Sequence, residues 1–534
     1  MAAVTEPRPP TPRACLAIAL GAFVLRMALV LRPVVVLDRL FAPDDTYYTL
    51  AIARSIARGM GPTVDGIHLT SGFQPLLAFL LVPFLRCCEE PDFAFRSALA
   101  IGVCADAVTT WLIGHLAFRI GRGSVSAAIV ASTTWALSSS AIAASLNGLE
   151  SSLSVAVTMG ALAMWMEARS RGTLLAWGLS GALLGLCLFT RVDTVFLVLV
   201  VGVATLLRAG IAATAASALG ALATALPWWA YALARFGTFV PESGAAVREQ
   251  TFVYSAMGIN VRDRVAWAAG AVVGPPIFDS TWLREALGRG ASAIGFALGV
   301  ALVVGALVIA RQSRRHDVVR MLTTYASCIF AFYSLYLPAT WFFRRYLLPV
   351  HVVSGLAFAL LVARVWDERR VRVWPARAVA AGVVLCVVAA LVTIVRFATS
   401  TPPMTVDQGH HGAKGYREPA RQVLAMAPSG AVIGSFQSGA LGWFADGSRR
   451  DVVNLDGVVD GEAARAFREH RMAAFARARG VTHLADWDMN VRLFLERSGD
   501  PRISRASLQA IGNTEPQGAR ERFVLYSITW PDPR

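Results

Sequence analysis

The sequence FAPDDTYYTLAIARSIARGMGPTVDGIHLTSGFQP occupies residues 41–75 and follows the first long apolar segment of the chain. It begins with two adjacent acids, Asp44 and Asp45, continues with a tyrosine pair, and ends in a polar loop rich in Gly, Pro and Thr. A membrane-spanning helix needs ~20 mostly apolar residues, and segment 14–33 satisfies that requirement. The two carboxylates therefore lie where the chain leaves its first predicted span.

The composition indicates a polytopic membrane protein. Of the 534 residues, 55% are hydrophobic and only 16% are charged, which is too apolar for an ordinary soluble domain. The net charge of +15 comes almost entirely from arginine. Cations beside apolar segments act as topology signals, so this charge does not indicate a nucleic-acid partner. A cleaved signal peptide is the alternative for 14–33, but no small-residue cleavage site follows it, and we expect a retained span.

The positions of the arginines indicate how many of the apolar segments cross the membrane. The apolar segments are 14–33, 73–88, 93–118, 124–146, 151–166, 172–189, 193–208, 210–234, 291–310, 318–337, 346–363 and 378–397. If the short segment 73–88 does not cross, all the arginine-rich connections lie on the side of the N-terminus. The positive-inside rule then makes that side cytoplasmic. We therefore predict eleven spans, an interfacial or re-entrant helix at 73–88, and an extracytoplasmic C-terminus.

The last quarter of the chain differs from the apolar region 1–397. In 398–534, the stretches AVIGSF, RDVVNLD, VTHLADW and RFVLYSITW alternate with a helical pattern, EAARAFREHRMAAFARARG, whose final glycine suits a C-cap. Strands alternating with helices predict a small α/β domain. The expected fold is an all-α multi-span membrane bundle, 1–397, followed by an extracytoplasmic α/β domain, 398–534.

The predicted topology brings polar sequences from distant parts of the chain to the outer side of the membrane. Besides Asp44 and Asp45, they are LNGLESS at 146–152, TRVD at 190–193 and ATWFFRRY at 339–346. A carboxylate can act as general base on an acceptor hydroxyl or amine, and a second can orient the acceptor or bind a metal. Guanidinium groups match the oxygens of a phosphate. This combination beside lipid predicts a transferase with a lipid-linked phosphate donor.

At this point the sequence resembles the GT-C superfamily of membrane glycosyltransferases, which includes protein O-mannosyltransferases, lipid A aminoarabinose transferases and mycobacterial arabinofuranosyltransferases. The resemblance rests on DDTYYTLAIARSIARG, the GFQPL that opens 73–88, the GLESSL turn and the Arg-rich loop near 344. It implies a polyprenyl-phosphate sugar as donor and inversion at the anomeric carbon. The acceptor would be an envelope glycan, lipid or protein at the outer face of the bacterial cytoplasmic membrane.

The resemblance also implies roles for individual residues. The acid of the first outer loop is the catalytic base, for which Asp44 is preferred and Asp45 lies beside it, and the acid of the second outer loop is Glu150. The expected phosphate ligands are Arg344, Arg345 and Arg191. The second loop lacks a D-x-D sequence, so a divalent metal is less expected than a metal-independent reaction. The seven cysteines lack metal-ligand spacing, and we expect small core residues.

Simpler interpretations stand beside these roles. Asp44 or Asp45 suits the N-cap of the following helix, and Glu150 suits the start of the next span. Arg191 and Asp193 suit a plain ion pair. Expected substrate contacts are Tyr47, Tyr48, His68 and Asp193. The tyrosines equally suit an interfacial belt, and a lone histidine usually has a structural role.

Two other functions fit parts of the sequence. A transporter or flippase for a lipid-linked precursor keeps charged groups near the bilayer midplane, and Asp106 is the feature in its favour. For Asp106 itself we expect a buried pair with an arginine or a hydroxyl. A non-catalytic scaffold would leave the outer acids dispensable. The favoured prediction is a transferase whose loops 41–92 and 237–290 close over the site, with 398–534 recruiting or orienting the acceptor.

Overall fold

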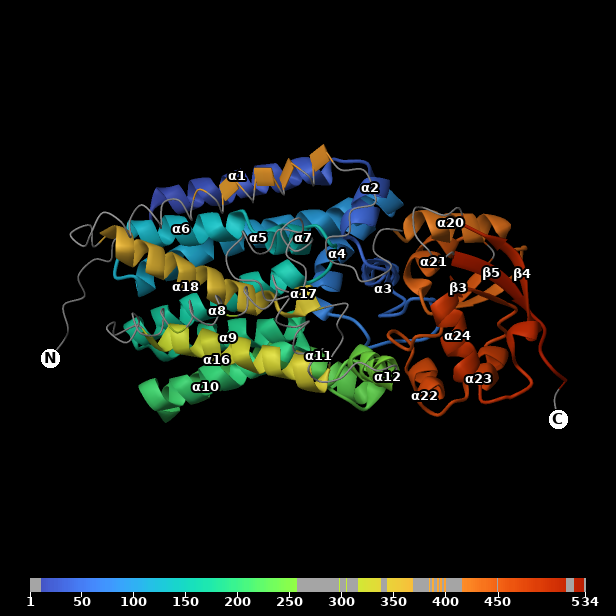
Figure 1. Cartoon of the computed structure of the whole chain (residues 1–534). Helices are drawn as coiled ribbons and strands as arrows, with labels where there is room; N and C mark the ends of the chain where they lie inside the picture. The colour runs from blue at the N-terminus through green and yellow to red at the C-terminus, as the bar shows by residue number, and fades with distance from the viewer. Residues whose placement is uncertain are drawn as a thin grey trace.

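The structure is a computed structural model with two parts. It describes residues 11–256, 316–337, 343–367, 415–448, 450–514 and 523–532, and isolated positions within 297–304 and 384–399. Figure 1 shows an elongated helical bundle with a C-terminal α/β domain at one end, and the N-terminus at the other. We name the end of the bundle that contacts this domain the domain end, and the opposite end the arginine end.

The bundle is that of a multi-pass membrane protein. Within the described residues, six helical segments are long and apolar enough to cross a membrane, or seven if the bent pair α6 (Val125–Ala136) and α7 (Ser139–Ser145) counts as one. The six are Arg13–Val30 (α1), Pro91–Ile120 (α5), Val192–Ala209 (η1 and α10), Ile211–Phe236 (α11), Asp317–Tyr336 (α16 and η2) and Leu348–Trp366 (α18). The predicted spans at 291–310 and 378–397 lie wholly or largely outside the described residues, so the total of eleven stays a prediction.

Helices α8 (Ser151–Arg171) and α9 (Leu174–Thr190) complete the described bundle. Glycines let α9 and α11 pack closely. A Cβ on Gly181 would lie 1.8 Å from the carbonyl oxygen of Ser217, and one on Gly220 would lie 2.0 Å from that of Gly178. Small residues permit such close backbone approach between membrane helices, where packing rather than water drives association.

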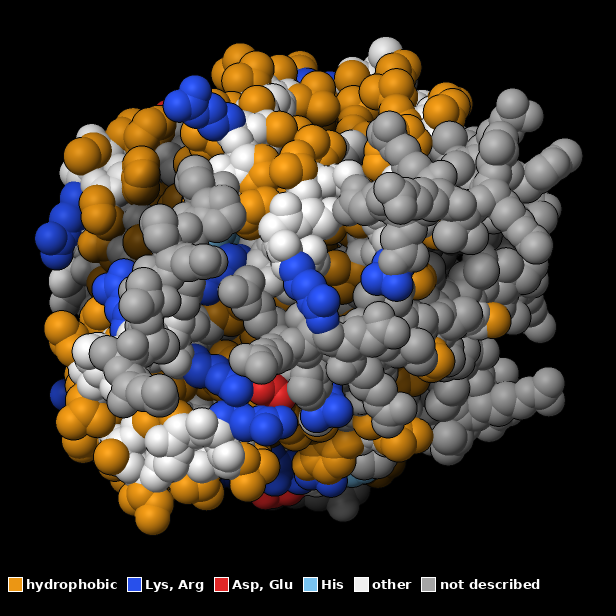
Figure 2. Space-filling model, turned by 90° about the vertical axis from the view of Figure 1, so that its left-hand side faces the viewer, with side chains coloured by type: hydrophobic (Ala, Val, Ile, Leu, Met, Phe, Trp, Pro, Cys, Tyr) orange, Lys and Arg blue, Asp and Glu red, His pale blue; other side chains and the backbone are white. Residues whose placement is uncertain are grey.

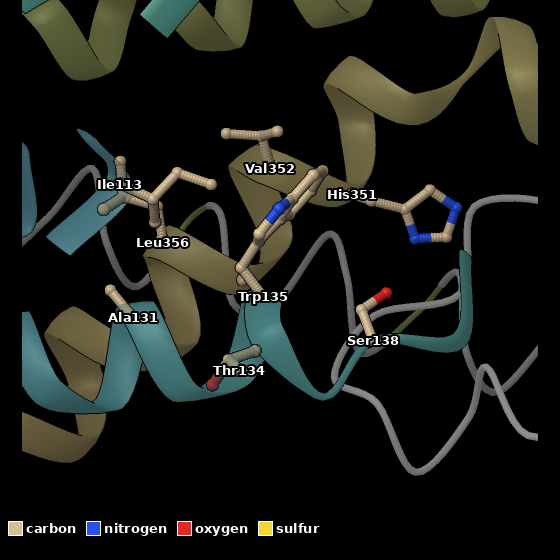
Figure 3. Close-up of a pocket in the computed structure, with 9 residues that line it drawn as sticks. Ile113, Ala131, Thr134, Trp135, Ser138, His351, Val352 and Leu356 are labelled. Atoms are coloured by element: carbon tan, nitrogen blue, oxygen red, sulfur yellow. The ribbon is translucent and has the colours of Figure 1, made fainter. Parts of the chain in front are cut away.

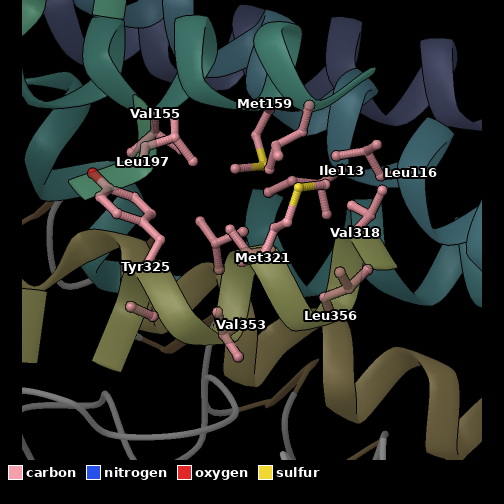
Figure 4. Close-up of a cluster of buried hydrophobic side chains, with 14 of the residues drawn as sticks. Ile113, Leu116, Val155, Met159, Leu197, Val318, Met321, Tyr325, Val353 and Leu356 are labelled. Atoms are coloured by element: carbon pink, nitrogen blue, oxygen red, sulfur yellow. The ribbon is translucent and has the colours of Figure 1, made fainter. Parts of the chain in front are cut away.

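The main apolar cluster of the bundle lies between α5, α8, α10, α16 and α18. Figure 4 shows side chains such as Leu116, Met159 and Met321 pointing into this cluster from different helices. The outward faces are apolar as well, with Leu207 75% and Ile211 80% exposed. Helices that are hydrophobic on all sides are typical of a membrane, since both the core and the lipid accept apolar side chains.

One charged pair is buried in the middle of the bundle. The Nε of Arg26 lies 3.0 Å from Oδ2 of Asp106, and neither side chain is exposed. Trp135 donates its indole N–H to the same carboxylate at 2.9 Å, and Arg26 also donates to the carbonyl of Ala136. The prediction that Asp106 forms a buried pair is confirmed. A paired and hydrogen-bonded charge avoids most of the cost of isolation in an apolar medium.

Arginines gather at the end of the bundle that lies farthest from the C-terminal domain, as Figure 2 shows. Arg171 pairs with Glu167 at 2.7 Å, Arg208 pairs with Asp317 at 3.0 Å, and Arg169 also contacts Asp317. These groups come from the last turns of α8 and α10 and the first turn of α16. Within the described residues, the arginines at the ends of α8 and α10 therefore share one end with the start of α16, as the parity argument requires.

Helix α4 (Pro75–Cys87) does not cross the bundle. Its 13 residues extend about 20 Å, short of the roughly 30 Å of a hydrocarbon core. Arg58 precedes α4 and Glu89 follows it, yet their side chains are 3.0 Å apart. Arg58 also pairs with Asp446 of the C-terminal domain at 3.0 Å. On the other side of α4, Gly72 lies against the C-terminal domain, because a Cβ there would be 1.8 Å from the carbonyl oxygen of Val458. Both ends of α4 therefore lie at the domain end, in agreement with the prediction for 73–88.

The C-terminal domain contains a mixed five-stranded sheet of order β2-β1-β3-β5-β4. The strands are β1 (Val432–Ser435), β2 (Asp451–Asn454), β3 (His483–Trp487), β4 (Leu508–Asn513) and β5 (Phe523–Ile528). The first three are parallel, and β5 is antiparallel to β3 and β4. Helices α20 (Arg417–Met426), α21 (Ser438–Ala445), α22 (Gly461–Arg468), α23 (Met472–Ala478) and α24 (Asp488–Glu496) accompany them. The predicted α/β domain is confirmed.

Candidate active site

Asp44 ties the bundle to the C-terminal domain. It stands at the N-cap position of α3 (Asp45–Ala57), but its side chain makes no capping bond to that helix. Its two carboxylate oxygens instead accept the backbone N–H groups of Gly439 and Ala440 at 2.7 and 2.8 Å, at the start of α21. Gly439 must be small, because a Cβ there would lie 2.4 Å from the carbonyl oxygen of Asp44. Burial raises the pKa of Asp44 to about 8, against the opposing effect of the two N–H bonds.

A second buried acid makes the same kind of contact. Asp38, in α2 (Val34–Phe41), accepts the backbone N–H groups of Tyr416 and Arg417 at 2.9 and 3.1 Å, at the start of α20. The hydroxyl of Tyr47 donates to the other oxygen of Asp38 at 2.8 Å. Two carboxylates of the bundle therefore satisfy free N–H groups of two helices in the C-terminal domain.

Asp45 points into the bundle instead. Its side chain is 30% exposed and lies 3.0 Å from Nη2 of Arg345, in the short helix α17 (Phe343–Tyr346). The Arg345 side chain is only 8% exposed, and its guanidinium lies 5.1 Å from the centre of the Tyr346 ring. Of the two adjacent aspartates, only Asp45 presents a carboxylate that water reaches.

The buried Arg191 joins two acids of the bundle, Glu150 and Asp193. Arg191 pairs with Glu150 at 2.7 Å and with Asp193 at 2.7 Å, and it donates to the hydroxyl of Tyr333 at 3.0 Å. Tyr333 lies in η2 (Phe332–Tyr336), a π-helical turn at the end of α16, and such turns are frequent at functional sites. Its ring stacks on Tyr346 with centroids 4.4 Å apart, which joins this group to Arg345.

The turn before α8 is fixed against the first turn of α3. Gly148 has a φ of +68°, and a Cβ there would lie 2.5 Å from Cγ2 of Thr46. The hydroxyl of Thr46 donates to the carbonyl of Asn147 at 2.7 Å. Glycine is the residue that accepts this backbone conformation without strain. The sequence LNGLESS therefore holds Glu150 close to the helix that carries Asp45.

Tyr48 connects α3 to the end of β2. Its hydroxyl lies 3.0 Å from Oγ of Ser438, 3.0 Å from Nδ2 of Asn454 and 3.4 Å from Oδ2 of Asp456. Asn454 is the last residue of β2, and Asp456 follows it in the loop toward α22. Burial raises the pKa of Asp456 to about 7, and the nearby Asp45 carboxylate adds to this effect. The carboxyl ends of the parallel strands therefore face α3.

The structure distributes the predicted site residues as follows. It brings Asp45, Glu150, Arg191, Asp193 and Arg345 into one cluster. The predicted ion pair between Arg191 and Asp193 is present. Glu150 stands at the N-cap position of α8, as its capping interpretation expects, but its side chain makes no cap bond and pairs with Arg191 instead.

The remaining predicted residues lie elsewhere. Tyr47 and Tyr48 are 1% and 3% exposed and contact the C-terminal domain or its anchor Asp38, so neither belongs to a lipid-facing belt. His68 lies 2.6 Å from Asp65 and contacts Arg479, away from the cluster's side chains. The side chain of Arg344 is outside the described residues.

Sequence reasoning missed Tyr333, Tyr346 and Asp456 as site residues. Tyr333 lies inside an apolar segment, where no charged neighbour marks it. Asp456 is the last residue of the predicted strand stretch RDVVNLD, and ligands of parallel sheets bind beyond the carboxyl ends of strands. That rule was the available signal for Asp456.

A small hollow in the bundle is separate from this cluster. Figure 3 shows it between α5, α6 and α18, with Ile113, Trp135, His351 and Leu356 among its lining residues. None of its lining residues is an acid or an arginine. Within the described part of the chain, no three His, Cys, Asp or Glu side chains are grouped as ligands for a metal ion.

Comparison with known proteins defines the fold. No protein-family model matches the chain, and no curated protein matches its sequence. The crystal structure of ArnT from Cupriavidus metallidurans bound to undecaprenyl phosphate matches with a TM-score of 0.53 and 14% identity, covering 96% of this chain and 97% of ArnT. The Archaeoglobus fulgidus oligosaccharyltransferase tethered with an acceptor peptide matches with a TM-score of 0.52 and 13% identity, covering 97% of this chain and 74% of that protein.

The chain therefore has the same fold as ArnT and the archaeal oligosaccharyltransferase, a fold that the GT-C resemblance of its sequence also predicts. The match to ArnT includes both the multi-span bundle and the C-terminal α/β domain. At these identities the likeness defines the architecture, and the substrates follow only from the chemistry of the site.

Proposed function

We propose that the chain is an integral-membrane glycosyltransferase that transfers a sugar from a polyprenyl-phosphate donor to an acceptor in the cell envelope. The observation that supports it most is the pair of Asp45 and Arg345, 3.0 Å apart, at the domain end of a GT-C bundle. A base and a phosphate ligand lie side by side where the bundle meets the C-terminal domain. ArnT, which has the same fold, was crystallised with undecaprenyl phosphate.

In this proposal Asp45, and not the initially preferred Asp44, is the general base. Both oxygens of Asp44 are engaged by α21, whereas the Asp45 carboxylate is partly exposed. Asp45 takes the proton of an acceptor hydroxyl or amine as the acceptor atom attacks the anomeric carbon. The bond from that carbon to the phosphate oxygen breaks, and its electron pair leaves with the polyprenyl phosphate. Attack opposite the leaving group inverts the anomeric configuration.

Arg345 is the proposed ligand of the leaving phosphate. Its guanidinium can hold Asp45 with one edge and still offer N–H groups to phosphate oxygens. Arg191 already has three partners, Glu150, Asp193 and Tyr333, so its proposed role is to orient this cluster. Glu150 then lies beside the acceptor path as the orienting acid. The mechanism requires no metal ion.

The arginine end is proposed to be cytoplasmic, in accord with the positive-inside rule. The site and the C-terminal domain then lie on the extracytoplasmic side of a bacterial cytoplasmic membrane. A lipid donor would enter from the bilayer along the apolar outer faces of the helices. An acceptor would come from the cell envelope.

The test is transfer from a panel of labelled polyprenyl-phosphate sugars in membranes of a deletion host. Wild type is compared at matched expression with Asp45→Asn and Glu150→Gln, and with Glu496→Gln as an exposed acid of the C-terminal domain. We expect Asp45→Asn to lose at least about a hundredfold in rate, the contribution of general base catalysis. Undecaprenyl phosphate should still raise the melting temperature of this variant. Unchanged transfer by Asp45→Asn would refute the assignment of the base.

The alternative of a transporter or flippase has less support. Its main sequence feature, Asp106, is neutralised by Arg26 and hydrogen-bonded to Trp135. If no donor in the panel gives transfer with wild type, uptake or flipping of the labelled lipid becomes the next assay.

A further inference from the structure

The loop after β2 places a carboxylate of the C-terminal domain beside the proposed site. Asp456 is held rigidly, since Oδ1 accepts the backbone N–H of Val458 at 2.8 Å and Asn454 binds its side chain. Gln250, in α12 (Glu242–Ala256), donates to its backbone carbonyl at 2.9 Å. Asn454, Leu455 and Gly457 around it are buried, but Asp456 is partly exposed. Solvent therefore reaches part of Asp456.

The same face of α3 carries Asp45 and the contact to Asp456. Tyr48 follows Asp45 by three residues, and residues so spaced are neighbours on one helix face, about 5–6 Å apart at Cβ. The Tyr48 hydroxyl lies 3.4 Å from Oδ2 of Asp456. Asp456 therefore approaches from the C-terminal domain the helix face that Arg345 approaches from the bundle.

The acids that the bundle brings to this face of α3 have cationic partners, whereas the acid that the C-terminal domain brings has none within the described residues. Asp45, Glu150 and Asp193 each pair with an arginine of the bundle. Asp456 has no cationic partner in the part of the chain that the structure describes; its bonds come from a tyrosine, an asparagine and a backbone N–H. A carboxyl group without a cationic partner accepts hydrogen bonds, and in its ionised form it attracts cations and repels phosphates.

We propose that Asp456 binds the acceptor and selects one whose reacting group is a hydroxyl or an amine on a neutral or cationic moiety. The inference rests on the proposed transferase function and names its acceptor class. The donor phosphate lies toward Arg345, and the acceptor lies between Asp45 and Asp456. Asp456 accepts a hydrogen bond from the acceptor, while Asp45 removes the proton of the attacking hydroxyl or amine. A phosphate oxygen as acceptor atom is disfavoured, because it would bring a second anion against Asp456.

The first test compares Asp456→Asn with Asp451→Asn. Asp451 is an exposed acid at the opposite end of β2. The control substitution therefore removes the same charge beside the same strand, but away from the proposed site. We expect the specificity constant for the acceptor to fall about 10- to 100-fold in Asp456→Asn, the loss of a hydrogen bond to a charged group, and not in Asp451→Asn. The shift in melting temperature caused by undecaprenyl phosphate should be equal in both variants and wild type.

Equal transfer by both variants would overturn the proposal, and so would loss of the undecaprenyl phosphate shift in Asp456→Asn, which would assign the residue to the fold or to the donor. Absence of transfer by wild type with every donor would instead refute the proposed function. These failures are therefore distinguishable.

The second test uses the wild-type protein only, so it does not depend on the folding of a variant. The labelled product formed in host membranes is isolated, and mass spectrometry identifies the atom that received the sugar. A hydroxyl oxygen or an amine nitrogen on a moiety without a phosphate is the expected result. Transfer to a phosphate oxygen, or to a hydroxyl that neighbours a phosphate on the same sugar, would overturn the proposal.

Discussion

The adjacent aspartates at the start of α3 should respond differently to the same substitution. Asp44→Asn keeps one oxygen acceptor and replaces the other with an NH2 group, so one of the buried N–H groups of Gly439 and Ala440 loses its acceptor. A buried N–H without a partner costs about 1–3 kcal/mol. Asp45→Asn removes the proposed base, which pairs with Arg345 of the bundle, and leaves the bonds of Asp44 to Gly439 and Ala440 in place.

Hydrogen exchange measured by mass spectrometry reports the difference directly. If exchange at the start of α21 proceeds through local separation from α3, a loss of about 1–3 kcal/mol accelerates it roughly 5- to 150-fold. Above about pH 8, where the docked Asp44 carboxyl is ionised and both of its oxygens accept, we expect this acceleration in peptide 436–445 of Asp44→Asn and not of Asp45→Asn. Transfer should show the reverse order, with the larger loss in Asp45→Asn.

Two results would refute this reasoning. One is exchange in 436–445 that is the same in Asp44→Asn as in wild type, which would mean that the two N–H bonds do not hold the domain. The other is accelerated exchange in Asp45→Asn, which would mean that the ion pair with Arg345 has a structural role. Peptides from α24, which does not contact α3 through these residues, serve as the internal control.

The remaining predictions concern pH, the buried pair and the phosphate ligand. Burial raises the pKa of Asp44 from 3.8 to about 8, so between about pH 4 and pH 8 the docked protein holds a proton that the separated carboxyl has released. Protection of 436–445 against hydrogen exchange should therefore be greatest at low pH and fall as the pH rises toward about 8. The Asp44→Asn variant should lose this pH dependence. The carboxylates facing Asp44, Asp45 and Asp456, raise the same pKa and strengthen the trend. Arg26→Met or Asp106→Leu alone should destabilise the bundle by about 3–5 kcal/mol in thermal or denaturant unfolding, because each leaves an unpaired buried charge. The double variant should recover most of this loss, because it removes both charges. Equal destabilisation by all three variants would contradict this. Arg345→Lys should weaken binding of undecaprenyl phosphate about tenfold in a titration, because an ammonium cannot hold Asp45 and a phosphate with one planar fork; unchanged affinity would remove Arg345 from the donor site.

The sequence predicts the architecture because both parts have strong local patterns. Apolar windows long enough to span a bilayer mark the bundle, and all four apolar stretches chosen in the last quarter of the chain contain strands of the sheet. The charge argument for α4 also holds, because both ends of this short helix lie against the C-terminal domain. The Asp106 pair follows from the cost of an isolated charge in an apolar medium.

The division of labour within the site could not be predicted in the same way. Local rules assign Asp44 to the N-cap of its own helix, but its hydrogen-bond donors lie 395 and 396 positions later in the chain. Arg345 and Asp45 are likewise 300 positions apart. Propensity and spacing describe neighbours in sequence, whereas these contacts depend on how the bundle and the C-terminal domain meet.

The geometry of a helix start explains why two carboxylates occur together there. Successive residues of a helix point in directions about 100° apart, so Asp44 and Asp45 address different neighbours from nearly the same position. Asp44 faces α21 of the C-terminal domain, and Asp45 faces α17 of the bundle. A displacement of the domain therefore moves the first turn of α3, and the same displacement moves the proposed base relative to Arg345. The docking of the C-terminal domain and the placement of the base are therefore coupled. Two acids on separate elements would not give this coupling.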